Sequence, residues 1–159
     1  MNNNVFDELK WRGLLYDSTE GMEEKLVNEK VTIYTGFDPT GDSLHVGSLV
    51  PIMGLARLQK FGHTPIALAG GGTGMIGDPS GKSATRPALT PLQISENAET
   101  YQKQVFKILD PETTEICFNS NWHGPRSSAD MIRLASRHTV ARMLERDDFS
   151  KRSKNNQPI

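Results

Sequence analysis

Residues 31–48 read VTIYTGFDPTGDSLHVGS, and this stretch decides the fold of the chain. Its first part, residues 31–35, is β-branched and aromatic and predicts a strand. A loop rich in glycine, aspartate and proline follows over 36–48. Beyond it, apolar residues at helical spacing predict an amphipathic helix over 46–61 that ends at Gly62. A strand that passes through a loop into a helix is how a β-α-β unit begins.

The alternation of strands and helices continues outward from this stretch. Residues 64–69 form a short apolar run that predicts a buried strand, and a second glycine-rich loop follows over 70–86. Three more elements follow from the same spacing rules: a helix over 91–109 with Thr90 as its N-cap, a strand over 114–118 and one long helix over 127–146. We therefore expect an α/β fold, a Rossmann-like doubly wound parallel sheet with helices against both faces.

The two ends of the chain differ from this centre. Residues 1–30 carry apolar residues at helical spacing with a break near Asp17, which predicts an N-terminal helical segment whose second helix is capped by Thr19. Residues 147–159 are polar and basic and lack periodicity, which predicts a polar tail. The chain thus divides into 1–30, a Rossmann-like centre over 31–146 and the tail. We expect it to be the N-terminal part of a longer protein.

The composition excludes several classes of protein. The 18 Lys and Arg residues against 19 Asp and Glu give a formal net charge of -1, without the basic excess of a purely electrostatic binder of nucleic acid or membranes. A single cysteine, Cys117, excludes an internal disulfide and a cysteine-rich zinc site, and it fits a reducing compartment. The sequence has no apolar run of membrane-spanning length and no signal peptide pattern. We expect a soluble, cytoplasmic protein without membrane contact.

Two short motifs in the second loop suggest other kinds of nucleotide site. Residues 72–77 match G-x-G-x-x-G after a strand, but Asp78 and Pro79 interrupt the helix that a dinucleotide site needs there. The GKS at 81–83 resembles the end of a P-loop, yet the first glycine of that motif would fall on Ile76. A dinucleotide-binding Rossmann domain is therefore the less favoured alternative, and a P-loop is less favoured still.

The two loops together are more specific than either motif. In a parallel sheet, ligands bind beyond the carboxyl ends of the strands, where both loops lie. The first loop ends in HVGS at 45–48, at the start of a helix, and the second reads GGGTGMIGDPSGK over 70–82. In this order, the loops resemble class I aminoacyl-tRNA synthetases, most closely the bacterial tyrosyl enzymes. The resemblance covers 9–146. The family signature His-x-Gly-His here has Ser48 in place of its last histidine.

The resemblance implies a reaction in which the carboxylate of L-tyrosine attacks the α-phosphorus of ATP and pyrophosphate leaves. The tyrosyl-adenylate then passes its tyrosyl group to tRNA(Tyr). This chemistry depends on orientation and charge stabilisation more than on proton transfer. As catalytic residues that contact the departing phosphates, the resemblance implies Thr40, His45, Lys82 and Arg86. As ATP-binding residues it implies Thr35, Asp38, His45, Gly47 and Ser48.

The amino-acid site is implied in the same way. The family holds the substrate phenol with a tyrosine matched by Tyr34 and the ammonium with an aspartate matched by Asp78, and Gly36 belongs to the same site. A hydroxyl that binds the phenol selects against phenylalanine, because a buried polar group would then be left unpaired. Taken singly, these residues have simpler explanations: Tyr34 could pack in a core, Asp78 could serve a turn, and His45 could cap a helix.

The resemblance also implies ATP with Mg²⁺ as a substrate, no metal site in the chain itself, tRNA(Tyr) as partner, and a homodimer in the full-length protein. The family's later Tyr-x-x-x-Gln helix and Lys-x-x-Lys-Ser loop are absent from this sequence, and 151–155 resembles the latter only by chance. We therefore expect weak activity from this chain alone. A non-catalytic module that holds ATP or another nucleotide without turning it over is the alternative from another class.

Overall fold

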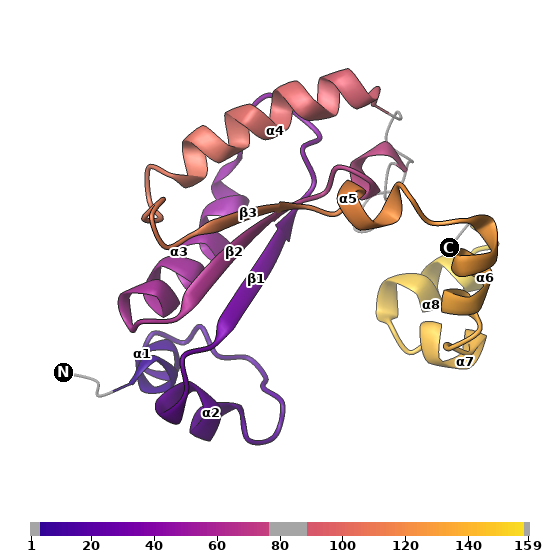
Figure 1. Ribbon diagram of the computed structural model, residues 1–159. Helices are drawn as coiled ribbons and strands as arrows, with labels where there is room; N and C mark the ends of the chain where they lie inside the picture. The colour runs from indigo at the N-terminus through magenta and orange to yellow at the C-terminus, as the bar shows by residue number, and fades with distance from the viewer. Residues whose placement is uncertain (1–3, 77–88, 158–159) are drawn as a thin grey trace.

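The computed structural model describes residues 4–76 and 89–157 (Figure 1). Its centre is a parallel sheet in the order β1-β2-β3, made of β1 (Thr32–Phe37), β2 (Thr64–Ala69) and β3 (Glu115–Phe118). The register places Tyr34 beside Ile66 and Leu68 beside Cys117. The predicted α/β class, the strands and their parallel pairing are confirmed.

The two crossover helices begin and end close to where the sequence predicts. α3 (Val46–Lys60) ends just before Gly62, whose φ of 92° is a conformation that glycine adopts without strain. α4 (Pro91–Val105) begins with the predicted cap, because the Thr90 hydroxyl accepts from the Gln93 N–H and the Gln93 side chain accepts from the Thr90 N–H. α4 ends four residues before the predicted boundary at 109.

α3 and α4 pack on the same face of the sheet. Along β1, exposed and half-buried residues alternate, which puts Ile33 and Phe37 on one face and Tyr34 on the other. Those two residues pack against one core cluster, formed by Ile52 and Leu55 of α3, Ala67 of β2, Val105 of α4 and Leu109. Right-handed crossovers that step in one direction across a sheet place successive helices on one face. The expectation of helices against both faces is therefore wrong for these two helices.

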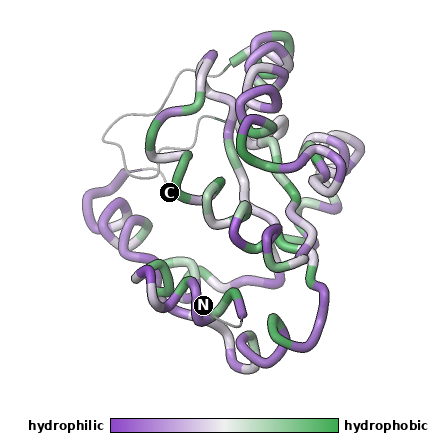
Figure 2. Tube along the Cα trace, turned by 90° about the vertical axis from the view of Figure 1, so that its left-hand side faces the viewer, coloured by the Kyte–Doolittle hydropathy of each residue, from purple (hydrophilic) through white to green (hydrophobic). Residues whose placement is uncertain are grey.

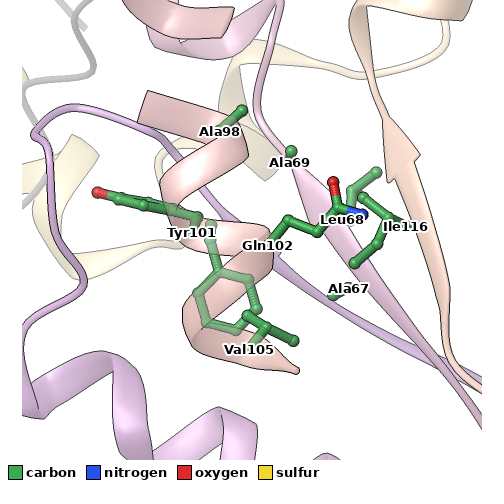
Figure 3. A pocket seen from close by; sticks show the side chains of 9 residues that line it. Ala67, Leu68, Ala69, Ala98, Tyr101, Gln102, Val105 and Ile116 are labelled. Carbon is green, nitrogen blue, oxygen red and sulfur yellow. The ribbon is translucent and has the colours of Figure 1, made fainter. Parts of the chain in front are cut away.

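The layer between α4 and the sheet is nearly filled. In Figure 3, the Gln102 side chain of α4 extends toward Leu68 and Ile116 of the sheet, and Ala98 and Val105 line the same cavity. The cavity between these mostly apolar side chains has a volume of about 20 Å³. A space of this size holds at most about one water molecule. This layer is a core and is too small for a nucleotide.

The N-terminal helices α1 (Val5–Trp11) and α2 (Met22–Asn28) lie where the spacing predicts helices. α1 buries Val5 and Phe6, and its Glu8 lies 3.8 Å from Arg57 of α3. The predicted Thr19 cap is wrong, because Gly21, with a φ of 77°, is the N-cap of α2. At this position the left-handed backbone geometry favours glycine over a capping side chain.

The C-terminal part differs from the prediction most. In place of one helix over 127–146, the structure has α6 (Ser128–Ala135) and α7 (Val140–Met143), and the short α5 (Ser120–His123) precedes them. The break occurs because Thr139 starts a new helix, its hydroxyl accepting from the Arg142 N–H at 3.1 Å. The predicted polar tail also contains a helix, α8 (Asp147–Lys154). Figure 1 shows α6, α7 and α8 grouped to one side of the sheet.

Polar and apolar residues alternate along most helices of the trace, as amphipathic helices require (Figure 2). Within 4–76 and 89–157, none of the helices combines the length and the apolar character that crossing a membrane requires.

Candidate functional site

A hollow of about 230 Å³ opens at the carboxyl ends of the three strands. Its lining comes from the end of β1, the end of β2, the glycine-rich loop and the residue after β3: Gly36, Phe37, Asp38, Leu68, Gly70, Thr73 and Asn119. In parallel α/β sheets this edge is where ligands bind. The hollow therefore lies where the sequence predicts a site.

A chain of hydrogen bonds joins the three strand ends at this hollow. Asn119, which is buried, accepts from the Gly72 N–H at 2.6 Å and donates through its Nδ2 to the Thr73 hydroxyl at 2.9 Å. That hydroxyl donates in turn to the Asp38 carboxylate at 2.7 Å. These three hydrogen bonds fix the orientation of the Asn119 amide and of the Thr73 hydroxyl. The Asp38 carboxylate, at the end of the series, is thereby held in one orientation.

Two glycines allow the loops to approach this closely. A Cβ atom on Gly70 would lie 1.9 Å from the Asp38 Oδ1 and 2.6 Å from the Thr73 Oγ1. A Cβ atom on Gly71 would lie 2.6 Å from the Ser120 Oγ. The glycine-rich loop therefore presents backbone against polar side chains, which is an arrangement that no residue with a side chain could keep.

Beside this edge, the N-terminus of α3 is capped by His45. The His45 Nδ1 accepts from the Gly47 N–H at 3.0 Å. In the neutral ring the proton is then on Nε2, which is left as a donor. A Cβ atom on Gly47 would lie 2.8 Å from the His45 ring, so this glycine makes room for the cap. Ser48 lies half-buried in the first turn, and its N–H bonds the His45 carbonyl at 2.9 Å.

The adjacent residues Tyr34 and Thr35 lie on opposite faces of β1. Tyr34 shares a face with Gly36 and is 69% exposed, so it is not a core aromatic in this chain. Thr35 is half-buried on the face that α3 and α4 cover. The packing explanation for Tyr34 therefore fails, because its ring has little to pack against.

The structure brings some of the predicted residues together. Gly36 and Asp38 line the hollow, and Thr40 is half-buried just beyond them, with its N–H bonded to the Asp38 carbonyl at 2.8 Å. Tyr34, His45 and Gly47 lie outside that lining. Three predicted residues, Asp78, Lys82 and Arg86, lie outside the described part of the chain.

Besides Thr73, Asn119 is a residue at this site that the sequence did not reveal. It follows β3 directly, so a polar residue after a predicted strand was the available signal. Its partners, Gly72 and Thr73, are more than forty positions away in the sequence, and only the tertiary structure identifies them.

The structure also bears on the alternatives for the second loop. Up to Ile76, where the described segment ends, the loop forms one 3₁₀ turn, Thr73–Met75, and no α-helix opens there. A dinucleotide fingerprint needs such a helix to bind pyrophosphate. Among the described residues, no three His, Cys, Asp or Glu side chains gather closely enough to hold a metal ion.

Comparison with known proteins gives consistent matches. Residues 25–159 match the family described as tRNA synthetases class I (W and Y). The chain is 55% identical to a tyrosine–tRNA ligase of Oleidesulfovibrio alaskensis, over 92% of this chain and 38% of that one. It is 61% identical to one of Nitratidesulfovibrio vulgaris, over 80% of this chain and 32% of that one.

The similarity extends to solved structures. A C-terminally truncated mitochondrial tyrosyl-tRNA synthetase of Aspergillus nidulans superposes with a TM-score of 0.80 at 22% identity, over 99% of this chain and 49% of that one. This likeness establishes a shared fold. The chain spans about a third of the length of the curated relatives it matches.

Proposed function

Because this chain belongs to the class I tRNA synthetases of the tryptophan and tyrosine type, we propose that it forms the ATP- and tyrosine-binding part of a tyrosine–tRNA ligase. The whole protein would activate L-tyrosine with ATP to tyrosyl-adenylate and transfer the tyrosyl group to tRNA(Tyr). One observation carries the proposal: a hollow bounded by the fixed Asp38 carboxylate lies beside the capped N-terminus of a helix. Such an edge can hold an amino acid and a nucleotide side by side.

The phosphates of ATP would lie near the N-terminus of α3. This helix has 15 residues, and its first N–H groups and dipole favour negative charge. His45 would donate from Nε2 to a phosphate oxygen, and Thr40 would supply a hydroxyl on the same loop. Lys82 and Arg86 would add positive charge to the departing pyrophosphate. Donors placed where charge develops stabilise the transition state.

ATP itself would occupy the side of the edge nearest α3, with Thr35, Asp38, Gly47 and Ser48 in contact or close by. Mg²⁺ would arrive with the ATP phosphates, because magnesium at nucleotide sites is bound mainly through substrate phosphates. When bound, the ion would neutralise phosphate charge.

Tyrosine would lie along the open face of the sheet. Tyr34 and Gly36 share that face, and Gly36 together with Leu68 lines the hollow. The Tyr34 hydroxyl would bind the substrate phenol, and Asp78 would bind its ammonium group. The choice of tyrosine over tryptophan is supported by the relatives, which are named as tyrosine–tRNA ligases at 55% and 61% identity.

The whole protein would be a homodimer. The exposed apolar residues of α6 and α7 surround a hollow of about 550 Å³, and the side chains involved include Met131, Leu134, Val140 and Met143. An apolar patch of this kind is typical of an interface.

We place the enzyme in the cytoplasm, where the single Cys117 would remain reduced.

ATP–pyrophosphate exchange in the whole protein tests the proposal. Exchange should require tyrosine, should be far weaker with phenylalanine or tryptophan, and should fall by about 10²–10³ in His45→Ala. Lys10→Ala, on the exposed surface of α1, is the control and should retain exchange. Binding of ATP without any exchange would support the non-catalytic module instead, and binding of NAD but not ATP would support the dinucleotide alternative.

A further inference from the structure

The loop between β1 and α3 is held at both ends by side chains of α4. The Asn97 Nδ2 donates to the Pro39 carbonyl at 3.0 Å. The Gln104 Oε1 accepts from the Leu44 N–H at 3.0 Å, and it also lies 3.4 Å from the Ser43 hydroxyl. These contacts join residues about sixty positions apart in the sequence.

The two amides suit this task because of their spacing. Residues seven apart lie on the same side of a helix, two turns or about 10 Å from each other. The attached loop points, Pro39 and Leu44, enclose Thr40, and His45 follows the second point directly. One rigid helix therefore fixes the loop immediately before and after the residues proposed to contact phosphate.

The surroundings strengthen this attachment. Pro39 is fully buried, and a Cβ atom on Gly74 would lie 3.6 Å from both Pro39 and Ile94 of α4. Leu44 packs against the core cluster. The loop thus has two anchored ends, while Asp42 and Ser43 between them are exposed.

We propose that Asn97 and Gln104 are positioning residues for the ATP-binding loop. The inference rests on the proposed function, since it concerns how Thr40 and His45 are kept in place for phosphate. Neither amide side chain contacts the residues proposed to bind tyrosine within the described part of the chain. Loss of either amide should therefore raise the KM for ATP and lower kcat, with little change in the KM for tyrosine. Misplacing binding groups by about 1 Å can lower the rate by as much as 10²-fold, and we expect about tenfold here.

The opposite polarity of the two contacts gives a sharp test. Gln104 acts as an acceptor, so Gln104→Glu keeps the contact to Leu44 while Gln104→Leu removes it. Asn97 acts as a donor, so Asn97→Asp loses the contact to Pro39 although it has nearly the same shape. A merely structural role for α4 would not produce this pattern. Lys103→Leu, an exposed change on the same helix, is the matched control.

Two measurements on the whole protein decide the question. Hydrogen-exchange mass spectrometry of the peptide covering 38–45 should show faster exchange in Gln104→Leu and Asn97→Asp, and wild-type protection in Gln104→Glu and Lys103→Leu. ATP–pyrophosphate exchange is then measured at varied ATP and at varied tyrosine concentration. The KM for ATP should rise in Gln104→Leu and Asn97→Asp, and it should stay at the wild-type value in Gln104→Glu and Lys103→Leu.

Unchanged loop protection in Gln104→Leu and Asn97→Asp, or equal changes in both KM values, would overturn the inference. Failure of the proposed function can be told apart from failure of this inference. If the proposed function is wrong, the wild-type protein itself will show no tyrosine-dependent ATP–pyrophosphate exchange. In that case the loop protection, together with calorimetric titration of ATP into the same variants, would still decide whether α4 positions the loop.

Discussion

The sheet with α3 and α4 and the group α6–α8 both contain amphipathic helices, but they are held in different ways. In the first region, core residues such as Ile52, Leu55 and Leu109 are at most 3% exposed. In the second, every large apolar side chain of α6 and α7 is at least 41% exposed: Met131, Ile132, Leu134, Val140 and Met143. Within the described residues, the first region therefore has a buried core, whereas α6 and α7 bury no residue and show only local capping.

The caps of the second region are well formed. Ser127 and Asp130 make a capping box for α6, and the Thr139 hydroxyl caps α7. Capping and side-chain pairs select where a helix begins, but they contribute little stability compared with burial. The comparison therefore indicates that the apolar side of α6 and α7 is available for a partner surface, as the proposed homodimer requires.

The largest expected difference between the regions is in the free energy of unfolding. Leu55→Ala should destabilise the chain by about 2–5 kcal/mol, since it removes a buried side chain from the core. Leu134→Ala, the same substitution on α6, should change the stability by about 0.5 kcal/mol or less because Leu134 is already exposed. Urea unfolding followed by fluorescence measures both. Equal losses would show that α6 is packed as tightly as the sheet region.

The same difference explains which parts of the fold the sequence predicts. The three strands and the Thr90 cap follow from local patterns, and the structure confirms them. The division of 127–146 was missed because apolar spacing continues across Thr139, although a threonine before a helical turn is a cap signal. α8 was missed as well, although Asp147 and Asp148 at its start and basic residues at its end fit the helix dipole.

The position of the hollow at the strand ends was predicted from the sequence, but the hydrogen bonds within it were not. The two loops lie at the carboxyl edge, as expected for parallel strands, and Gly36 and Asp38 line the hollow there. The contacts of Asn119 with Thr73 and of Gln104 with Leu44 depend on how distant segments pack. No local pattern encodes such pairs. The helices on one face follow from the strand order, which the sequence leaves open.

The next largest expected loss of stability comes from breaking the series of hydrogen bonds at the strand ends. Asn119→Ala should destabilise the chain by about 1–3 kcal/mol, because the Gly72 N–H and the Thr73 hydroxyl lose a buried partner. It should also weaken ATP and tyrosine binding in the whole protein, since the Asp38 carboxylate is no longer held through Thr73. Asn121→Ala, two residues away and exposed, is the control. Unfolding and calorimetric titration measure the two effects, and an Asn119 variant indistinguishable from the Asn121 variant would contradict the assigned role.

A substitution on the open face of the sheet should change the selectivity for the amino acid and leave the stability of the fold unchanged. Tyr34→Phe should reduce the preference of the whole protein for tyrosine over phenylalanine by about 1–3 kcal/mol, because the substrate phenol loses a partner. The stability should hardly change, since Tyr34 is 69% exposed. Tyr16→Phe, on a fully exposed tyrosine, should leave the selectivity as it is. The ratio of kcat/KM values for the two amino acids decides, and an unchanged ratio would remove Tyr34 from the proposed tyrosine site.

Protonation should affect the sheet region at mild acidity through His63. This side chain is buried at the start of β2, where its Nδ1 accepts from the Val31 N–H at 3.3 Å, and burial lowers its pKa from the usual 6.5. Because the folded protein resists protonation, stability should be lost as the pH falls below about 6.5 toward the folded pKa. His63→Asn keeps an acceptor and does not titrate, so it should flatten this pH dependence, whereas His138→Asn on the surface should not. Urea midpoints between pH 7.5 and 5 measure the slope.

The smallest expected effect is confined to α6 and appears at lower pH. The hydrogen bond from the Ser127 hydroxyl is the main cause that lowers the pKa of Asp130 below its usual 3.8. A carboxylate with a lowered folded pKa adds stability above 3.8, and this contribution is lost as the pH falls through the folded pKa. The N-terminal cap of α6 should therefore open below pH 3.8, after the sheet region has already responded to His63. Amide chemical shifts of Ser127 and Asp130, followed by NMR from pH 6 to 2.5, measure the midpoint, and Asp130→Asn should remove it. If these shifts instead move together with those of β2 in one transition near pH 6, the two regions are coupled in folding, and the contrast between burial and capping does not hold.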